Sequence, residues 1–148
     1  MDLGHVGLVV ADAHATRLAY EQAFGIADFI EYEFRPPRVL SYGRVIDDCH
    51  LRIALGTFEN GVKLEILQVV TGDTALARFF NGRGAGLHHL NFYTEEFDRI
   101  KAEQIARGAA IVFEAEVEDE RGYRRTMYVD NPALGAVVEY SERPRKRG

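Results

Sequence analysis

Two short segments of the chain decide its fold. Residues 61–66 read Gly-Val-Lys-Leu-Glu-Ile, and residues 135–140 read Gly-Ala-Val-Val-Glu-Tyr. Both consist of a glycine, three strand residues, a glutamate and an apolar residue. The segments at 5–10 and 20–25 are loosely echoed, in the same order, at 89–94 and 102–108. The shared order of three weak matches predicts an internal repeat.

The first half reads as a strand, a helix and three further strands. We expect the first strand at 5–10 and the helix at 13–24, where Asp12 caps the start and Gly25 ends it in a left-handed conformation. The later strands are expected near 28–34, 49–56 and 62–69, with Pro36-Pro37 in a loop. The apolar stripe of the helix is predicted to consist of Ala15, Leu18, Ala19 and Ala23.

The second half follows the same plan. We expect a strand at 88–93 and a helix at 95–107 that is capped by Thr94 and closed by Gly108. The strands after it are expected near 110–116, 124–130 and 136–141. The inward residues of the helix are predicted to be Phe97, Ile100 and Ile105. A short helix at about 74–80, capped by Asp73, connects the two halves.

This repeat predicts an α+β fold of two paired βαβββ modules. The helix of each module covers one face of its strands, so the bare faces must be shared, and a cupped sheet around a central cavity results. We expect a single domain over residues 1–148. Its parts are module one at about 3–70, a connecting helix at about 73–81, module two at about 86–142 and a basic tail at 143–148.

Composition narrows the classes of function. The 148 residues carry a formal net charge of −5, which argues against nucleic acid as a partner and against attraction to an anionic membrane surface. The sequence has no apolar run near 18 residues, which predicts no membrane span. A single cysteine excludes an intrachain disulfide. The first residues do not resemble a signal peptide, so we expect a cytoplasmic protein.

The repeat also points to four residues that can hold a metal ion. His5 and Glu65 in the first half correspond to His89 and Glu139 in the second. Two imidazoles and two carboxylates suit a divalent ion such as Zn²⁺, Ni²⁺, Co²⁺, Mn²⁺ or Fe²⁺. Because neighbours on a strand face opposite sides, matching the apolar faces of the two halves selects His89, and His88 is expected on the helix side.

At these positions the sequence resembles the vicinal oxygen chelate superfamily, which includes glyoxalase I, methylmalonyl-CoA epimerase, extradiol dioxygenases and bleomycin resistance proteins. The resemblance covers about residues 3–142 and rests on the ligand positions His5, Glu65, His89 and Glu139. The epimerase branch is most similar, because residues 71–80 resemble its inter-module helix and residues 82–89 its Gly-rich lead into Gly-Leu-His-His. This resemblance implies a metal-dependent enzyme and a homodimer.

The sequence supports three hypotheses about the function. The first is an epimerase, isomerase or lyase that polarises a substrate carbonyl or acyl thioester for proton transfer at the adjacent carbon. The second is a protein of the bleomycin-resistance type that sequesters a small molecule without turnover. The third, a ring-cleaving dioxygenase, is disfavoured because those enzymes use two histidines and one glutamate, whereas this chain has a second carboxylate at Glu65.

Several residues are candidates for the chemistry itself. We expect Glu139 to be the leading base and Glu65 the second. Methylmalonyl-CoA epimerases carry a catalytic glutamate on the strand before Glu65, and alignment places Arg52 there. An arginine cannot act as a base at neutral pH but can clamp a substrate anion. We expect Arg52, His50, Asn91 and Tyr93 to contact the substrate.

Overall fold

The computed structural model describes residues 1–26 and 28–148 of the chain. The elements up to the middle of the chain are β1 (Leu3–Val9), α1 (Ala13–Phe24), β2 (Ile30–Phe34), β3 (Val39–Ser41), β4 (Arg44–Ile46), β5 (His50–Thr57) and β6 (Lys63–Thr71). The later elements are α2 (Ala75–Arg83), β7 (Gly86–Tyr93), α3 (Phe97–Ala106), β8 (Ala110–Asp119), β9 (Gly122–Asp130), the 3-10 turn η1 (Pro132–Leu134) and β10 (Val137–Ser141).

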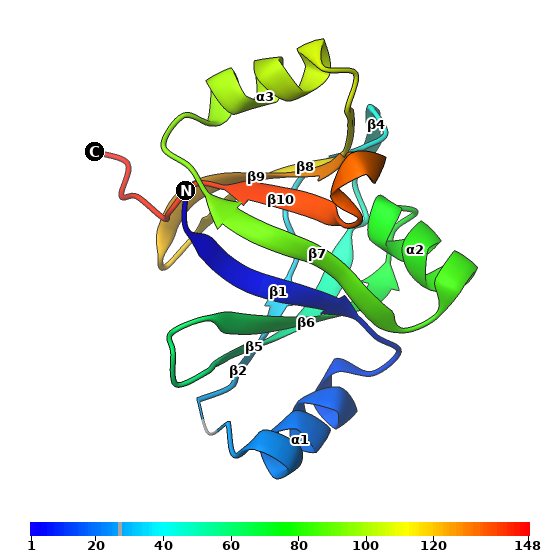
Figure 1. The fold of residues 1–148 in the computed structure, drawn as a ribbon, viewed down its shortest axis with the longest axis vertical. Helices are drawn as coiled ribbons and strands as arrows, with labels where there is room; N and C mark the ends of the chain where they lie inside the picture. The colour runs from blue at the N-terminus through cyan, green and yellow to red at the C-terminus, as the bar shows by residue number, and fades with distance from the viewer. Residues whose placement is uncertain (27) are drawn as a thin grey trace.

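The strands within this part of the chain form one mixed sheet in the order β2-β5-β6-β1-β7-β10-β9-β8-β3-β4. The sheet curls into a half-barrel (Figure 1). Strands β1 and β7 pair antiparallel at its centre and join the two modules, while β6 and β10 lie parallel to β1 and β7 respectively. The predicted α+β fold with a cupped sheet is therefore confirmed.

The β3–β4 hairpin was not predicted, because we expected a loop around Pro36-Pro37. It pairs with β8, so a segment of the first half extends the edge of the second module. Its turn consists of Tyr42 and Gly43, which both have positive φ values as a tight two-residue hairpin requires. The Ser41 hydroxyl donates to the Val112 carbonyl at 2.9 Å and accepts from the Ala75 backbone N–H at 2.9 Å, which ties the hairpin to the start of α2.

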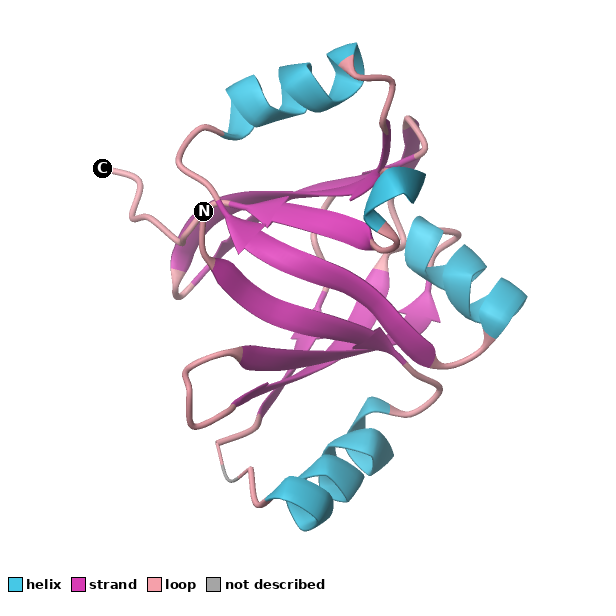
Figure 2. Cartoon of the chain, viewed as in Figure 1, coloured by secondary structure: helices cyan, strands magenta, loops and turns pink. Residues whose placement is uncertain are grey.

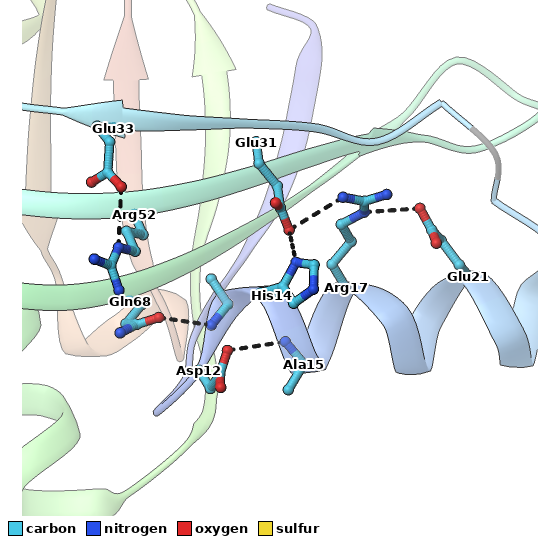
Figure 3. Close-up of polar contacts among 10 residues, drawn as sticks. Asp12, His14, Ala15, Arg17, Glu21, Glu31, Glu33, Arg52 and Gln68 are labelled. Carbon is cyan, nitrogen blue, oxygen red and sulfur yellow. Dashed lines mark hydrogen bonds and ion pairs between the residues drawn. The ribbon is translucent and has the colours of Figure 1, made fainter.

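Helix α1 has the predicted ends but not the predicted buried face. Asp12 accepts from the Ala15 backbone N–H at 3.0 Å, and Gly25 ends the helix with a φ of 65°. The predicted apolar stripe faces solvent, and Leu18 is 46% exposed. The residues of α1 that meet the sheet are Ala13 and Tyr20, which pack in an apolar cluster with β1 and β6. Beside them, His14 and Arg17 both contact Glu31 of β2 (Figure 3). These ion pairs and the burial of Ala13 set the rotation of the helix.

The other two helices also differ in detail from the prediction. Thr74 caps α2 through a bond from the Ala77 N–H, so Asp73, which pairs with arginines, is not the cap. Helix α3 begins at Phe97, and the Thr94 hydroxyl accepts only from the Glu96 N–H just before it. On α3, Phe97 and Ile100 are buried as predicted, but Ile105 is 54% exposed.

The three helices occupy different sides of the curled sheet. Helices α1 and α3 lie outside it on opposite sides, and α2 lies at one end (Figures 1 and 2). The residues of α1 pack with the outer side chains of β1 and β6, and those of α3 pack with β9. Leu76 of α2 instead packs inside the cup with residues such as Leu51 and Phe113, so α2 closes one end of the interior. No helix of the described residues is long and apolar enough to cross a membrane.

Candidate metal centre and cavity

The pairing at the centre of the sheet explains why the four predicted ligands converge. Gly7 of β1 lies opposite Glu65 on one side and opposite His89 on the other. Two residues earlier, His5 lies opposite Asn91, which in turn lies opposite Glu139 of β10. Four adjacent strands thus bring one ligand each to the inner face of the cup.

The ligand atoms lie at distances that fit a single ion. All four atoms lie within 4.8 Å of one another. His5 Nε2 lies 3.0 Å from His89 Nε2, 2.8 Å from Glu139 Oε2 and 3.5 Å from Glu65 Oε1. His89 Nε2 lies 3.5 Å from Glu65 Oε1 and 3.3 Å from Glu139 Oε2. Ligands at about 2.1 Å from a common ion are separated by about 3.0 Å at octahedral and about 3.4 Å at tetrahedral angles.

One buried oxygen supports this interpretation independently. Glu139 Oε2 accepts no hydrogen bond from any residue the structure describes, although it faces both imidazoles. A buried carboxylate oxygen without a partner is costly, and an ion at the centre would satisfy it together with the other three atoms. The residues present therefore fit a divalent ion.

The two glutamates are held differently. Thr126 of β9 donates its hydroxyl to Glu139 Oε1, which turns Oε2 toward the histidines. The Glu65 carboxylate makes only the two 3.5 Å contacts to the imidazoles among the interactions of the described residues. Glu139 is therefore the fixed carboxylate and Glu65 the freer one. The role of Thr126 was not predicted. It depends on the pairing of β9 with β10, which places Thr126 opposite Ser141, and the sequence does not show this register.

Burial and charge have opposite effects on the protonation of the cluster. Burial by itself lowers the pKa of His89, but the nearby carboxylates of Glu139 and Glu65 favour its protonated form, outweigh burial and raise that pKa to about 9. The pKa of His5 is also raised, because the charges of Glu65 and Glu139 overcome the effect of burial. The pKa of Glu139 falls well below its usual range, since its attraction to His5 and His89 exceeds the cost of burial.

His89 needs the absence of a side chain at Gly7. A Cβ atom built on Gly7 would lie 2.0 Å from His89 Cε1 and 2.3 Å from its Nε2. The imidazole therefore lies directly across the Gly7 backbone. Tyr128 stacks on its other side, with ring centroids 4.8 Å apart. The Gly7 backbone and the Tyr128 ring therefore restrict the position of the imidazole from both sides.

Three residues of the cluster, His5, Glu65 and Glu139, form part of the wall of a cavity of about 340 Å³. Most of the remaining wall is apolar or aromatic, from residues that include Tyr32, Leu51, Ile53, Phe113 and Tyr128. At the β8–β9 turn, Arg121 and Arg124 also line the cavity and share the carboxylate of Asp119. Arg121 lies over the Tyr32 ring at 5.1 Å, so this turn reaches across to β2 at the other edge of the sheet. This long-range contact was not predicted from the sequence.

Two residues predicted to bind substrate do not line this cavity. Arg52 Nε donates to Glu33 Oε1 at 3.1 Å, and His50 contacts the other oxygen of Glu33 (Figure 3 shows the Arg52 contact). The Arg52 side chain is 54% exposed. The cavity side of β5 is instead occupied by Leu51 and Ile53. Arg52 and His50 therefore lie outside the wall of this cavity.

The other two predicted contacts differ from each other. Asn91 is wholly buried and donates to Ser141 Oγ at 2.7 Å, so it supports the wall behind the cluster rather than contacting a ligand. Tyr93 lines the cavity, and Arg143 lies 4.2 Å above its ring. Burial raises the pKa of the Tyr93 hydroxyl, which keeps it protonated at neutral pH.

The fold and the cluster define a class of protein in which paired βαβββ modules surround a site for a divalent ion. Residues 4–128 match the Glyoxalase/Bleomycin resistance protein/Dioxygenase superfamily. The chain belongs to this superfamily, as the resemblance of the sequence predicted.

Individual relatives agree with this assignment. The uncharacterized protein YqjC of Bacillus subtilis (strain 168) is 30% identical over 91 residues, which are 61% of this chain and 55% of the relative, so the match spans about half of that protein. Methylmalonyl-CoA epimerase from Mycobacterium tuberculosis superimposes with a TM-score of 0.68 at 19% identity, covering 97% of this chain and 87% of the epimerase. A variant of the Streptomyces coelicolor epimerase, in complex with 2-nitronate-propionyl-CoA, gives 0.69 at 18% identity and covers 97% of each chain.

Proposed function

We propose that the protein is a metal-dependent enzyme that moves a proton at the carbon next to a carbonyl or thioester of a small substrate, as an epimerase, isomerase or lyase. The observation that carries this proposal is the four-residue cluster, three members of which line a largely apolar cavity. A divalent ion bound there would supply a Lewis acid for the substrate carbonyl oxygen. The complexes of the epimerase structures with methylmalonyl-CoA and 2-nitronate-propionyl-CoA support an acyl thioester as one substrate class.

The contacts of the two glutamates favour Glu65 as the base, ahead of Glu139. Both line the cavity, so both carboxylates are within reach of a ligand there. Glu139 is fixed by Thr126, whereas Glu65 makes only the longer contacts to the histidines. A base must turn toward the substrate to accept its proton, which costs least for the freer carboxylate. Glu139 then stays in place and orients His5 and His89, and Tyr93, which lines the same cavity, can return a proton.

The apolar inner side of β5 makes a two-base epimerase less suitable. Leu51, Ile53 and Leu55 line the cavity from this strand, so it contributes no carboxylate there. In this proposal, the cluster and Tyr93 carry out proton removal and return. We therefore propose a substrate other than methylmalonyl-CoA within the same chemical class.

Deuterium exchange tests the reaction type before any product is known. The protein is loaded with Co²⁺, Ni²⁺ or Zn²⁺ and incubated in heavy water with acyl-CoAs, 2-oxoaldehyde–thiol adducts and β-keto acids. We expect uptake of deuterium at the α-carbon of at least one compound, with loss of uptake in Glu65→Gln and retention in Arg52→Ala. No uptake into any compound by a metal-loaded protein would contradict the proposal.

The same cavity favours one alternative, because its wall is largely apolar. A sequestering protein would bind a small hydrophobic molecule there without exchange. Binding of an apolar compound with equal affinity in the presence and absence of metal, together with no exchange, would favour this second function. We also propose that the protein is a cytoplasmic homodimer, and light scattering during size-exclusion chromatography measures the oligomeric state.

A further inference from the structure

We propose that His88 is a positioning residue that holds the His89 imidazole with its Nε2 atom facing the other three ligand atoms. The inference deepens the proposed function, since it concerns a residue that supports the same metal centre. It rests on the backbone of β7, on one imidazole–imidazole contact and on the packing around His88.

The backbone of β7 is irregular at His88. Gly7 of β1 lies opposite His89, but the next residue, Leu8, lies opposite Leu87. His88 is therefore the extra residue of a β-bulge between two otherwise paired strands. On a regular strand, adjacent side chains point to opposite faces. A bulge redirects a side chain, and here it brings the two consecutive imidazoles together, with ring centroids 5.2 Å apart.

The contact between the two rings fixes which nitrogen carries the proton. His88 Nδ1 lies 3.0 Å from His89 Nδ1, a distance at which one of them donates to the other. A neutral imidazole that binds a metal through Nε2 has its proton on Nδ1. His89 must then donate, and His88 must accept through an unprotonated Nδ1. Such a partner fixes both the tautomer and the orientation of a ligating histidine.

The surroundings of His88 hold it in the orientation that this role requires. The Phe79 ring of α2 packs against it at 4.8 Å, with the planes at 83°, and Tyr128 lies 5.6 Å away. Only 5% of His88 is exposed. It lies between the cluster and a second cavity of about 650 Å³, bounded in part by α2 and the segment around η1. Phe79 of α2 and Tyr128 of β9 therefore both supply packing for this residue.

Two variants separate positioning from simple packing. His88→Leu removes the acceptor but keeps an apolar side chain, whereas His88→Asn retains an oxygen close to the place of Nδ1. His14→Asn, on the exposed face of α1, is the matched control. Affinity for Zn²⁺ and Co²⁺ is measured by calorimetry on protein stripped by a chelator. The protected, downfield Nδ1–H proton of His89 is observed by NMR in the metal-free protein, and circular dichroism checks the fold.

We expect His88→Leu to lose about 10–100-fold in metal affinity, and His88→Asn to remain within about threefold of the wild type. The protected imidazole proton should be present in the wild type and in His88→Asn and absent in His88→Leu. Wild-type affinity and an unchanged proton signal in folded His88→Leu would overturn the inference. If the wild type binds no metal, the proposed function fails, while the proton signal still decides whether His88 positions His89.

Discussion

Replacing Gly7 with alanine should push the His89 imidazole out of the ligand cluster. The added Cβ would lie 2.0 Å from His89 Cε1 and 2.3 Å from Nε2. The distance between this Cβ and His89 Cε1 must increase by about 1.5 Å to reach an ordinary carbon contact of about 3.5 Å. The ring cannot yield easily, because it is fully buried and stacks on Tyr128.

The size of the effect follows from this displacement. A metal–nitrogen bond tolerates deviations of only about 0.2 Å, so a shift near 1.5 Å removes one ligand. We expect a loss of affinity for Zn²⁺ or Co²⁺ of more than about 100-fold, which exceeds the usual effect of a residue that only supports a ligand. The metal-free protein should lose about 1–3 kcal/mol of unfolding free energy through overpacking.

Calorimetric metal titration and urea unfolding measure the two effects. Gly82→Ala is the matched control, because nothing lies within 4 Å of a Cβ built on this α2 residue. It should bind metal normally and should gain up to about 1 kcal/mol of stability. In a His89→Ala background the clash is relieved, so Gly7→Ala should then cost little. Equal destabilisation by Gly7→Ala with and without the imidazole, or normal metal affinity in this variant, would refute the reasoning.

Four other predictions concern Glu65, Arg52, bound metal and Glu142. Glu65→Gln should bind metal more weakly, because one charged ligand is lost. At saturating metal it should lower α-proton exchange by at least about 100-fold, as expected for loss of a general base; exchange within tenfold of the wild type would exclude that role. Arg52→Ala should leave metal affinity and exchange unchanged and alter stability by at most about 1 kcal/mol in denaturant titrations, because its exposed pair with Glu33 lies outside the cavity. Adding metal at about 100 times its Kd should stabilise the stripped protein by about 2.7 kcal/mol, which calorimetry would record as a rise in Tm of about 5–10 °C; no rise would contradict binding. The guanidinium of Arg125 lowers the pKa of Glu142, so wild type should exceed Glu142→Gln in stability above the unfolded pKa of about 4.3 and lose this advantage as pH falls through the lower folded pKa; a pH-independent difference would be inconsistent with this.

The repeated sequence pattern was enough to predict the architecture and the metal cluster. The four residues stand at related places in two similar segments. Strand alternation pointed to His89 but did not predict the bulge at His88, which brings the two imidazoles together. Helix α1 could be bounded from Asp12 and Gly25, because capping and left-handed glycine are local effects. The internal repeat and the local capping signals could therefore be identified from the sequence.

Side-chain contacts that depend on the pairing and packing of particular strands and helices could not be predicted. The prediction assumed that Arg52 faces the site. In the structure, Leu51 and Ile53 at the alternate positions of β5 line the cavity, and Arg52 points to the other side of the strand. The buried face of α1 is set by Ala13 and Tyr20 and by ion pairs to Glu31, rather than by the predicted stripe of Ala15, Leu18, Ala19 and Ala23. The support of Glu139 by Thr126 depends on the pairing of β9 with β10, which the sequence of either strand does not specify.

Anomalous diffraction from a crystal soaked in Co²⁺ tests the central claim most directly. We predict one peak per chain, about 2.0–2.2 Å from His5 Nε2, His89 Nε2 and one oxygen each of Glu65 and Glu139. A fully soaked crystal with no peak among these four atoms, or with the ion bound elsewhere while the four side chains keep their mutual contacts, would contradict the claim that they form a metal centre.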